Sequence, residues 1–273
     1  MNYKLIASDL DGTLLYDIST VSEENYRAIA EYKKMGGHFV PASGRCFYEI
    51  PKELRECEDI RYYISSNGAV VTDTATGELD EVLIPNETFD KIMELMSEYE
   101  IYHTVHFEGC AYMLAENDSE ERAKYYNVNK YYYIHFHENC RKLENLDGKF
   151  SQGRGVEMLS VFFKSQAELD ECVKKLNALG GLVVTSSTDF NLEIIAEGAS
   201  KGDGVRRLAK KLGISTSEAI GVGDSRNDMA LLDGVGMPLA VSNAKDVLKA
   251  KAKKIICSNK EHIARYILDN LIK

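Results

Sequence analysis

The sequence predicts an α/β protein whose core is a doubly wound parallel sheet, with a second, α+β domain inserted into that core. Short apolar runs alternate with helix-like stretches in the first and last thirds of the chain, and this alternation is typical of parallel sheets covered by helices. The middle third differs, because several strand-like runs follow one another closely there. We therefore expect the core in residues 1–82 and 191–273 and the inserted domain in residues 83–190.

Local signals define the elements of the core. Ser22 is a predicted N-cap for a helix that stops near Gly36. Another helix is expected over residues 201–212, and Ser258 with Glu261 forms a predicted capping box for the last helix. Short apolar runs predict strands at 4–8, 38–42, 62–65, 219–222, 238–241 and 254–257.

The inserted domain has helix and strand signals of its own. Asn86 is a predicted cap for a helix with one apolar stripe, and Ser165 with Glu168 forms a capping box for another. Strands are expected at 102–107, 111–114, 157–163, 182–185 and 192–195. Residues 125–137, rich in tyrosine and histidine, are interpreted as a half-buried strand, although their rings could also stack on a sugar or a base.

Composition excludes several classes of protein. The chain has 273 residues, of which 44% are hydrophobic and 28% charged, and its formal net charge is −10. The acidic balance argues against a nucleic-acid partner, which would need a basic surface, but a local lysine and a metal could still hold a phosphorylated metabolite. Because no apolar run approaches the roughly 18 residues of a membrane span and no signal peptide is apparent, we expect a cytoplasmic protein without a membrane partner.

Cysteine and histidine usage argues against a zinc site. The six cysteines are scattered and form no C-x-x-C pair, which also favours a reducing compartment. His135 and His137 would share a face in an extended strand, but the sequence offers no obvious third ligand.

Two acidic residues directly follow the first predicted strand. Asp9 and Asp11 lie two positions apart, so their side chains point the same way while the chain stays extended, and Gly12 permits a sharp turn after them. Ligands of open parallel sheets bind beyond the carboxyl ends of the strands. The pair therefore suits a divalent metal, an acid/base pair or both, and the simpler alternative is a polar turn with a helix-capping aspartate.

A second acidic motif follows the strand at 219–222. Residues 221–228 read GVGDSRND, so Asp224 and Asp228 could face the same pocket. Carboxylate oxygens of this kind favour Mg²⁺. The GVG triplet does not make a dinucleotide-binding fingerprint, because the third glycine is missing and acids stand where backbone amides would be needed.

A lysine and a short polar loop could bind phosphate. Lys201 opens a predicted helix, where a cation is electrostatically misplaced, so it is a candidate for neutralising a phosphoryl group. A solvated surface lysine is the simpler alternative. Ser43 and Gly44, after the second strand, offer a hydroxyl and an amide that can hold a phosphate oxygen.

Together these four segments resemble those of the haloacid dehalogenase superfamily of aspartate-nucleophile phosphotransferases, in particular its Cof-type branch with a class IIB α+β cap. The matching residues occur in the family's order: Asp9, Asp11 and Thr13, then Ser43, then Lys201, then Asp224, Asn227 and Asp228. The resemblance spans the whole chain, since that branch carries its cap between Ser43 and Lys201. Residues 66–69 (SNGA) also resemble the branch. Residues 237–244 (MPLAVSNA) depart from its usual Met and Gly before Asn-Ala, which leaves the shape of one pocket wall open.

The resemblance implies a role for each of these residues. Asp9 would be the nucleophile that forms an aspartyl-phosphate, and Asp11 would be the general acid and then the base for the attacking water. Lys201 and Ser43 would stabilise the phosphoryl oxygens. Further phosphate contacts are implied for Leu10, Gly44 and Asn227, and a supporting role for Thr13.

The resemblance also implies a metal, a substrate class and an activity. Mg²⁺ would be held by Asp9, the backbone carbonyl of Asp11, and Asp224, with Asp228 nearby. Candidate substrate contacts are Arg45 and Asn67. The implied activity is that of a Mg²⁺-dependent phosphatase of small phosphorylated metabolites such as sugar phosphates, acting as a monomer or homodimer. Two alternatives are a phosphomutase of the same superfamily and a non-catalytic protein that senses a phosphorylated metabolite.

Overall fold

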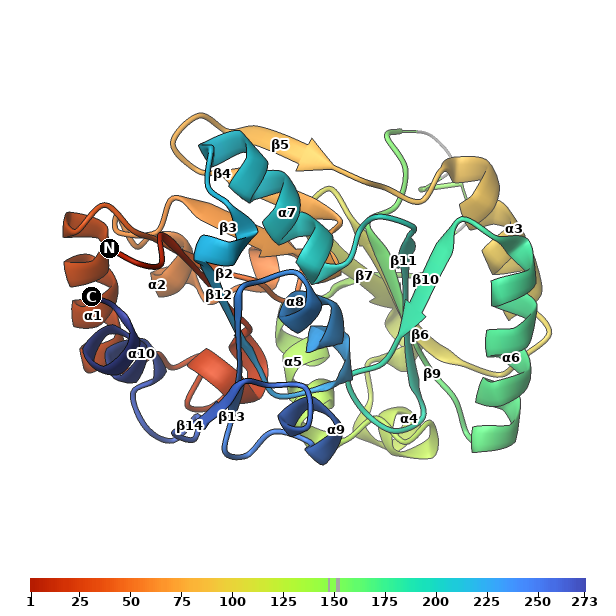
Figure 1. The fold of residues 1–273 in the computed structure, drawn as a ribbon. Coiled ribbons are helices and arrows are strands. Elements are labelled where there is room, and N and C mark those ends of the chain that lie inside the picture. Colours follow the sequence, from red (N-terminus) through yellow and green to blue (C-terminus); the bar gives the residue numbers. More distant parts are fainter. Residues whose placement is uncertain (147, 151–152) are drawn as a thin grey trace. The chain divides into compact units, whose positions relative to one another are not determined.

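The computed structural model of the chain describes residues 1–146, 148–150 and 153–273 (Figure 1). The chain divides into two compact units. The first comprises Met1–Arg45, Ile50–Glu81 and Ser200–Lys273, and the second comprises Cys46–Glu49 and Val82–Ala199. The end of the first core segment thus lies within one residue of the expected boundary at 82, whereas the core resumes at Ser200 and not at residue 191.

A five-stranded parallel sheet forms the centre of the first unit, in the order β14-β13-β12-β1-β2. Its strands are β1 (Leu5–Ser8), β2 (His38–Pro41), β12 (Ala219–Gly223), β13 (Met237–Val241) and β14 (Lys254–Ile256). The chain passes from β1 to β2 on one side, while β12 pairs with the other side of β1. The predicted doubly wound sheet is confirmed, and the change of direction at β1 is where such sheets bind ligands.

Helices of the first unit begin largely where the capping signals predict. They are α1 (Glu23–Lys34), α2 (Lys52–Arg55), α7 (Lys201–Leu212), α8 (Met229–Asp233), α9 (Asp246–Lys249) and α10 (Ile263–Leu271). Ser22 caps α1, and Ser200 forms a capping box with Asp203 at the start of α7. The hydrogen-bonded pair predicted at Ser258 forms, but it precedes the last helix, which starts only at Ile263.

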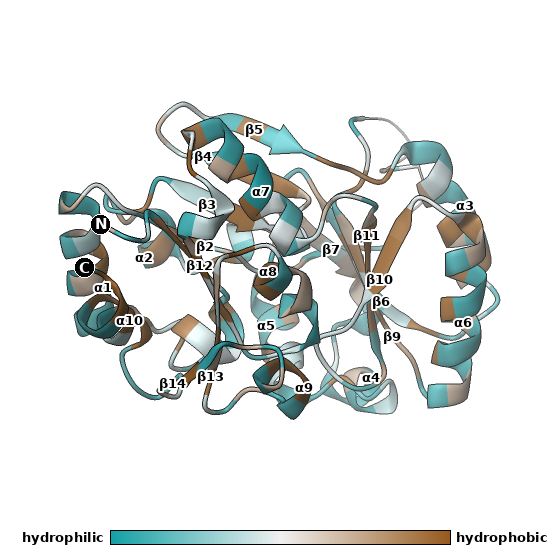
Figure 2. Cartoon of the chain, in the orientation of Figure 1, coloured by the Kyte–Doolittle hydropathy of each residue, from teal (hydrophilic) through white to brown (hydrophobic). Residues whose placement is uncertain are grey.

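The strand predicted at 62–65 forms in a separate antiparallel sheet. Its members are β3 (Tyr62–Ser65), β4 (Val70–Asp73) and β5 (Glu78–Glu81), paired in that order. One parallel bridge, between Ala42 and Ile64, connects β3 with the end of β2. β5 is hydrophilic (teal in Figure 2), as suits an edge strand, because charged side chains there discourage pairing with other chains.

The second unit contains a six-stranded sheet in the order β10-β11-β9-β6-β7-β8. Its strands are β6 (Tyr102–Phe107), β7 (Cys110–Leu114), β8 (Arg141–Leu143), β9 (Met158–Phe162), β10 (Leu182–Thr185) and β11 (Asn191–Ala196). All pairs are antiparallel except β7 with β8. Because β11 hydrogen-bonds to both β9 and β10, residues 191–196 belong to the inserted unit, which corrects the expected boundary at 191.

Two helices of the second unit match the predicted positions. They are α3 (Asn86–Met96) and α6 (Gln166–Leu179). The Ser165 hydroxyl accepts a hydrogen bond from the backbone N–H of Glu168 and so caps α6 as predicted. Asn86 is the first residue of α3 and not its cap, because Pro85 occupies the N-cap position.

The tyrosine- and histidine-rich segment is helical, so its interpretation as a strand was wrong. It forms α4 (Glu120–Tyr125) and α5 (Lys130–Asn139), and the side chain of Asn129 caps α5 by accepting from the Tyr132 N–H at 3.0 Å. Phe136 and Tyr126 pack in one apolar cluster with Tyr102 of β6 and with Phe162 of β9.

This correction also separates the two histidines of the segment. His135 and His137 are two residues apart on a helix, so they do not share a face. His135 Nε2 lies 3.1 Å from Glu49 Oε1, whereas His137 Nδ1 lies 2.8 Å from Asp118 Oδ1.

A buried histidine in β6 should make stability depend on pH. His103 is 7% exposed, and neither ring nitrogen has a hydrogen-bond partner among the described residues. Burial lowers the pKa of His103 from 6.5 to about 4. Between these pH values the unfolded chain binds a proton that the folded chain does not, so stability should fall as the pH drops from 6.5 towards 4.

Replacing this side chain tests the effect. Urea unfolding of His103→Leu should show a gain in stability over the wild type that is about 2 kcal/mol larger at pH 5 than at pH 8. His262→Gln, at an exposed histidine, is the control, and its change in unfolding free energy relative to the wild type should be nearly the same at pH 5 and at pH 8. An identical pH slope for wild type and His103→Leu would contradict the prediction.

Candidate active site

The carboxylate of Asp9 lies just beyond the end of β1, an inner strand of the parallel sheet. Its backbone N–H donates to the Val222 carbonyl at 2.9 Å, which extends the pairing of β1 with β12 by one residue. After Asp9 the chain turns sharply through residues 10–14, and Gly12 has a φ of +75°. Asp9 is only 4% exposed, so strand pairing and the turn together hold a nearly buried carboxylate at the sheet edge.

Lys201 joins two of the predicted acidic residues. Its Nζ donates to Asp9 Oδ1 and to Asp228 Oδ1, both at 2.7 Å. The side chain is 1% exposed, so it is not the solvated surface lysine of the simpler interpretation. Burial alone would lower the pKa of Lys201, but the two carboxylates raise it above its ordinary value, so Lys201 is a fixed positive charge.

The acidic residues of the two motifs converge. Asp9, Asp224 and Asp228 each offer one carboxylate oxygen within 4.8 Å of the others. Burial and then repulsion from Asp228 raise the pKa of Asp9 well above its ordinary value, and the same two causes raise the pKa of Asp224 to about 7. One lysine does not offset three clustered carboxylates, so the residues present fit a bound cation, and their hard oxygens suit Mg²⁺.

Asp228 organises the site from within. Its Oδ2 accepts from the backbone N–H groups of Asp224, at 3.0 Å, and Ser225, at 3.1 Å, while Oδ1 accepts from Lys201. The residue is fully buried. These contacts show Asp228 positioning Lys201 and the backbone next to Asp224.

Asp11 is paired with an arginine that the sequence suggested for a different role. Arg45 Nη2 lies 2.6 Å from Asp11 Oδ1, and Arg45 Nε lies 2.9 Å from Oδ2. A further bond joins the guanidinium to the Ile18 carbonyl at 2.8 Å. Arg45, expected to contact substrate, thus holds Asp11 in two-point contact.

The expected phosphate-binding residues of two loops lie on either side of the expected substrate contact Asn67. Ser43 is fully buried, and its Oγ accepts from the Arg45 N–H at 3.1 Å. A Cβ on Gly44 would lie 3.2 Å from Asn67 Oδ1, and Asn227 Nδ2 donates to the same oxygen at 3.3 Å. Asn67 is therefore in contact with two candidate phosphate-binding loops.

Leu10 and Thr13 contribute through the backbone and through packing. Both are fully buried. The apolar side chain of Leu10 offers no polar atom, so only its backbone could contact a phosphate. Thr13 Oγ1 has no hydrogen-bond partner among the described residues, so any support that Thr13 gives the turn would come from its packing.

Sequence reasoning missed two residues that hold the acidic motifs in place. Asn243 Nδ2 donates to the Gly12 carbonyl at 2.8 Å, and the Lys245 N–H donates to the Asp224 carbonyl at 2.8 Å. Both lie in or beside the stretch 237–244, where the signal that could have identified them is the Asn-Ala pair at Asn243 and Ala244.

Comparison with known proteins decides the family. The family model for haloacid dehalogenase-like hydrolases matches residues 6–267 of this sequence. The chain belongs to the haloacid dehalogenase-like hydrolases. The hydrolase is 29% identical to phosphatase YwpJ of Bacillus subtilis, over 98% of this chain and 100% of that one. It is 28% identical to 5-amino-6-(5-phospho-D-ribitylamino)uracil phosphatase YwtE of the same organism, over 98% of both chains.

Solved structures agree with this assignment. A haloacid dehalogenase-like hydrolase from B. subtilis matches this hydrolase with a TM-score of 0.82 and 26% identity, covering 98% of this chain and 99% of that chain. The HAD subclass IIB sugar phosphatase BT4131 shares the fold, with a TM-score of 0.80 at 20% identity over 99% and 100% of the two chains. The predicted Cof-type branch with its class IIB cap, the fold class and the enzyme class, a phosphatase, are confirmed.

Proposed function

We propose that this hydrolase is a Mg²⁺-dependent phosphatase that cleaves phosphate monoesters of small metabolites through an aspartyl-phosphate on Asp9. The observation that carries the proposal is the buried Asp9 carboxylate, bonded to Lys201 at 2.7 Å and clustered with Asp224 and Asp228. A nucleophilic carboxylate needs nearby positive charge to approach a phosphate dianion. Lys201 supplies part of that positive charge, and a cation held by the clustered carboxylates would supply the rest.

The reaction would proceed in two balanced steps. An Asp9 oxygen attacks phosphorus while the bond from phosphorus to the ester oxygen breaks, and the leaving oxygen takes a proton from Asp11. A water then attacks the phosphorus of the Asp9 adduct and gives a proton to Asp11, while the bond from phosphorus to the Asp9 oxygen breaks, which releases inorganic phosphate and restores the Asp9 carboxylate. The ion pair with Arg45 favours the ionised form of Asp11, which is the form that accepts a proton in the second step. In the first step Asp11 must be protonated, so that step requires the ion pair to open.

The surrounding groups would bind the phosphoryl oxygens and the cation. Lys201, Ser43 and the backbone of Leu10 would contact phosphoryl oxygens, and Asp228 keeps Lys201 in position. When bound, Mg²⁺ would be held by Asp9, Asp224 and the Asp11 carbonyl, and would supply positive charge that reduces the repulsion between carboxylate and phosphate.

The expected substrates are small phosphorylated metabolites. The relative YwtE is named for a phosphorylated ribitylamino-uracil, and the related fold of BT4131 belongs to a sugar phosphatase, so phosphorylated sugars and sugar alcohols are the first class to test. The net charge of −10 makes a nucleic-acid partner unfavourable. Within the described residues, no helix combines the length and the apolar character needed to cross a bilayer.

A substrate panel tests the proposal. Purified protein should release inorganic phosphate from members of a panel of sugar, sugar-alcohol and nucleoside monophosphates when Mg²⁺ is present, and release should stop with EDTA. Release without any bisphosphate activator would separate a phosphatase from a phosphomutase. Tight binding of a phosphorylated ligand without turnover of any panel member would favour the sensor alternative and overturn the proposal.

Gly12 offers a sharper test of the acidic cluster. A Cβ at this position would lie 2.8 Å from Asp224 Oδ2, so Gly12→Ala should displace that carboxylate and lower kcat/KM by about 100-fold. Gly77→Ala is the matched control, because Gly77 has nearly the same φ, +74°, with open space around it. Both variants should lose about 1–2 kcal/mol of stability in thermal or urea unfolding. Equal activity of the two variants would contradict the geometry.

A further inference from the structure

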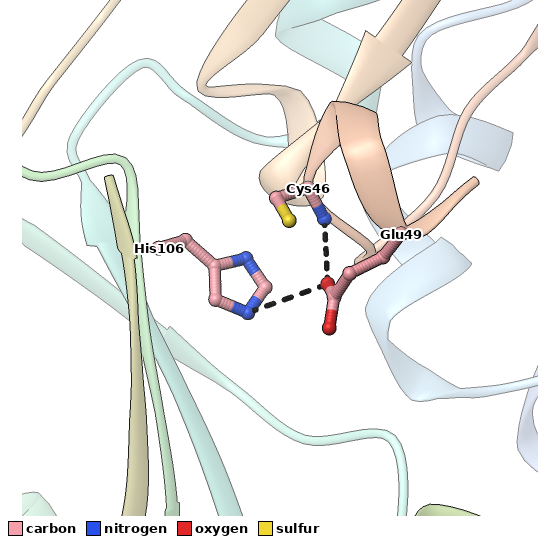
Figure 3. A group of neighbouring side chains, drawn as sticks. All are labelled: Cys46, Glu49 and His106. Atoms are coloured by element: carbon pink, nitrogen blue, oxygen red, sulfur yellow. Dashed lines mark hydrogen bonds and ion pairs between the residues drawn. The ribbon is translucent and has the colours of Figure 1, made fainter. Parts of the chain in front are cut away.

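A group of side chains of the types that bind transition metals is buried in the second unit. Cys46 and Glu49 come from the short segment after Arg45, and His106 comes from β6. Figure 3 shows the three side chains turned toward one another. Their exposed fractions are 0%, 4% and 3%, so protein shields the group from solvent.

Glu49 is at the centre of this group. Its Oε2 lies 3.8 Å from His106 Nε2 and accepts the Cys46 N–H at 3.0 Å. The other oxygen, Oε1, lies 3.1 Å from Nε2 of His135, on α5. Cys46 Sγ, a Glu49 oxygen and a His106 ring nitrogen all lie within 4.8 Å of one another. Since Zn²⁺ bonds to such atoms at about 2.0–2.3 Å, small side-chain adjustments would let one ion contact all three.

The donor set differs in kind from that of the acidic cluster. A thiolate, an imidazole and a carboxylate together favour Zn²⁺ and its transition-metal neighbours over Mg²⁺, which takes oxygen ligands. The proposed phosphatase reaction uses none of these side chains, so it does not explain why they are gathered.

The contact between His135 and Glu49 is of the kind that orients metal ligands in proteins. Ligating carboxylates are commonly held by a second hydrogen-bonding residue, which fixes their orientation. His135 makes this contact with Glu49, and Asn139 Nδ2 lies 3.3 Å from the other ring nitrogen of His135. The arrangement therefore includes three candidate ligands together with a residue, His135, that orients one of them.

We propose that Cys46, Glu49 and His106 bind one divalent transition-metal ion of the Zn²⁺ class, with His135 orienting Glu49 and water completing the coordination. Because the ion would join the segment Cys46–Glu49 to β6, it would also stabilise the folded second unit through its binding free energy. The sequence did not reveal this site, since Cys46 and His106 are far apart along the chain and neither belongs to a spaced ligand motif.

Cobalt binding to the full-length protein tests the proposal. Co²⁺ replaces Zn²⁺ in such sites, and a cobalt–thiolate bond gives a charge-transfer absorption in the near ultraviolet. Metal-stripped, reduced protein should be titrated with Co²⁺ in excess Mg²⁺, which occupies the acidic cluster. The wild type should develop the absorption up to one equivalent of Co²⁺ and lose it when Zn²⁺ is added. The readout does not depend on phosphatase activity, so it is independent of the function proposed above.

Variants assign the absorption to the named residues. Cys46→Ser should abolish the band, and His106→Gln should weaken Co²⁺ binding by at least about tenfold. Cys172→Ser, at another fully buried cysteine of the same unit, is the matched control and should keep the band. Circular dichroism verifies that each variant is folded, and His106→Gln retains the test should Cys46→Ser fail to fold. Absence of the band in the wild type, or its persistence in Cys46→Ser, would overturn the proposal.

Discussion

Replacing Asp9 with asparagine should reduce phosphate release by about 10⁴-fold or more, because the side chain loses the nucleophilic oxygen on which the covalent step depends. The amide has nearly the same shape and can still accept a hydrogen bond from Lys201, which lies 2.7 Å from Asp9 Oδ1. The fold should therefore be preserved. The measurement is steady-state phosphate release on the best substrate of the panel, with circular dichroism to verify folding.

The control for this variant is an aspartate outside the site. Asp246 is exposed at the start of α9, so Asp246→Asn should keep nearly full activity. Covalent chemistry can also be observed directly: rapid quenching of the wild type during turnover, followed by borohydride reduction, should convert the phosphorylated residue 9 into homoserine. Near-normal turnover by Asp9→Asn, or trapping of phosphate on another residue only, would refute the assignment of the nucleophile.

Replacing Lys201 with methionine should damage both stability and catalysis. The ammonium group is the direct partner of Asp9 and Asp228, and all three side chains are buried. Removing one partner of a buried ionic group leaves uncompensated charge, so we expect a loss of about 3–5 kcal/mol in metal-free buffer. Loss of the fixed charge near the phosphoryl group should lower kcat by about 100-fold or more.

Urea unfolding with and without Mg²⁺ shows whether Lys201→Met loses stability through uncompensated charge or through lost packing. Mg²⁺ should restore part of the lost stability of Lys201→Met, since it brings a cation back to the carboxylates. Lys211→Met is the control on the same helix: Lys211 makes an exposed ion pair with Glu78, so its loss should cost under about 1 kcal/mol. The double variant Asp9→Asn/Lys201→Met should be less destabilised than Lys201→Met alone, and a larger loss would show that charge is not the cause.

The pairing of Asp9 with Lys201 shows how much of the site the sequence could predict. The two residues are 192 positions apart, yet each lies at a position that topology fixes, at the end of a central strand and at the start of a helix. Alternating strands and helices place such positions at one edge of a parallel sheet. The acidic residues and the lysine were therefore predictable as a group without knowledge of any distance.

Contacts made by long side chains could not be predicted in this way. Arg45 was expected only as a candidate substrate contact, and the contacts of its guanidinium with Asp11 and the Ile18 carbonyl were not foreseen. Several acceptors lie within reach of a flexible arginine, and only the folded loops determine which of them it meets. Asp228 is a similar case, because its backbone donors were invisible in the residue pattern.

The segment 125–137 shows where local preference was overridden. Tyrosine, phenylalanine and isoleucine favour strands, and the run of tyrosines hid the helical spacing. The helix forms because Asn129 caps it and because Phe136 packs into the apolar cluster that includes Tyr102 and Phe162. Tertiary packing therefore decided the conformation, and the N-cap residue Asn129 was a local signal that could have revealed α5.

The pairing of β1 with β12 constrains how the enzyme is made. Leu5 of β1 lies opposite Ala219 of β12, so in a nascent chain emerging from the ribosome the strand that precedes Asp9 keeps one side open until most of the chain has been synthesised. Such late closure slows folding and exposes an unpaired apolar edge to other chains. Premature termination before β12 would thus yield a product that lacks Asp224 and Asp228 and is prone to aggregate, which makes synthesis of β12 and the loop after it a precondition for assembling the candidate site.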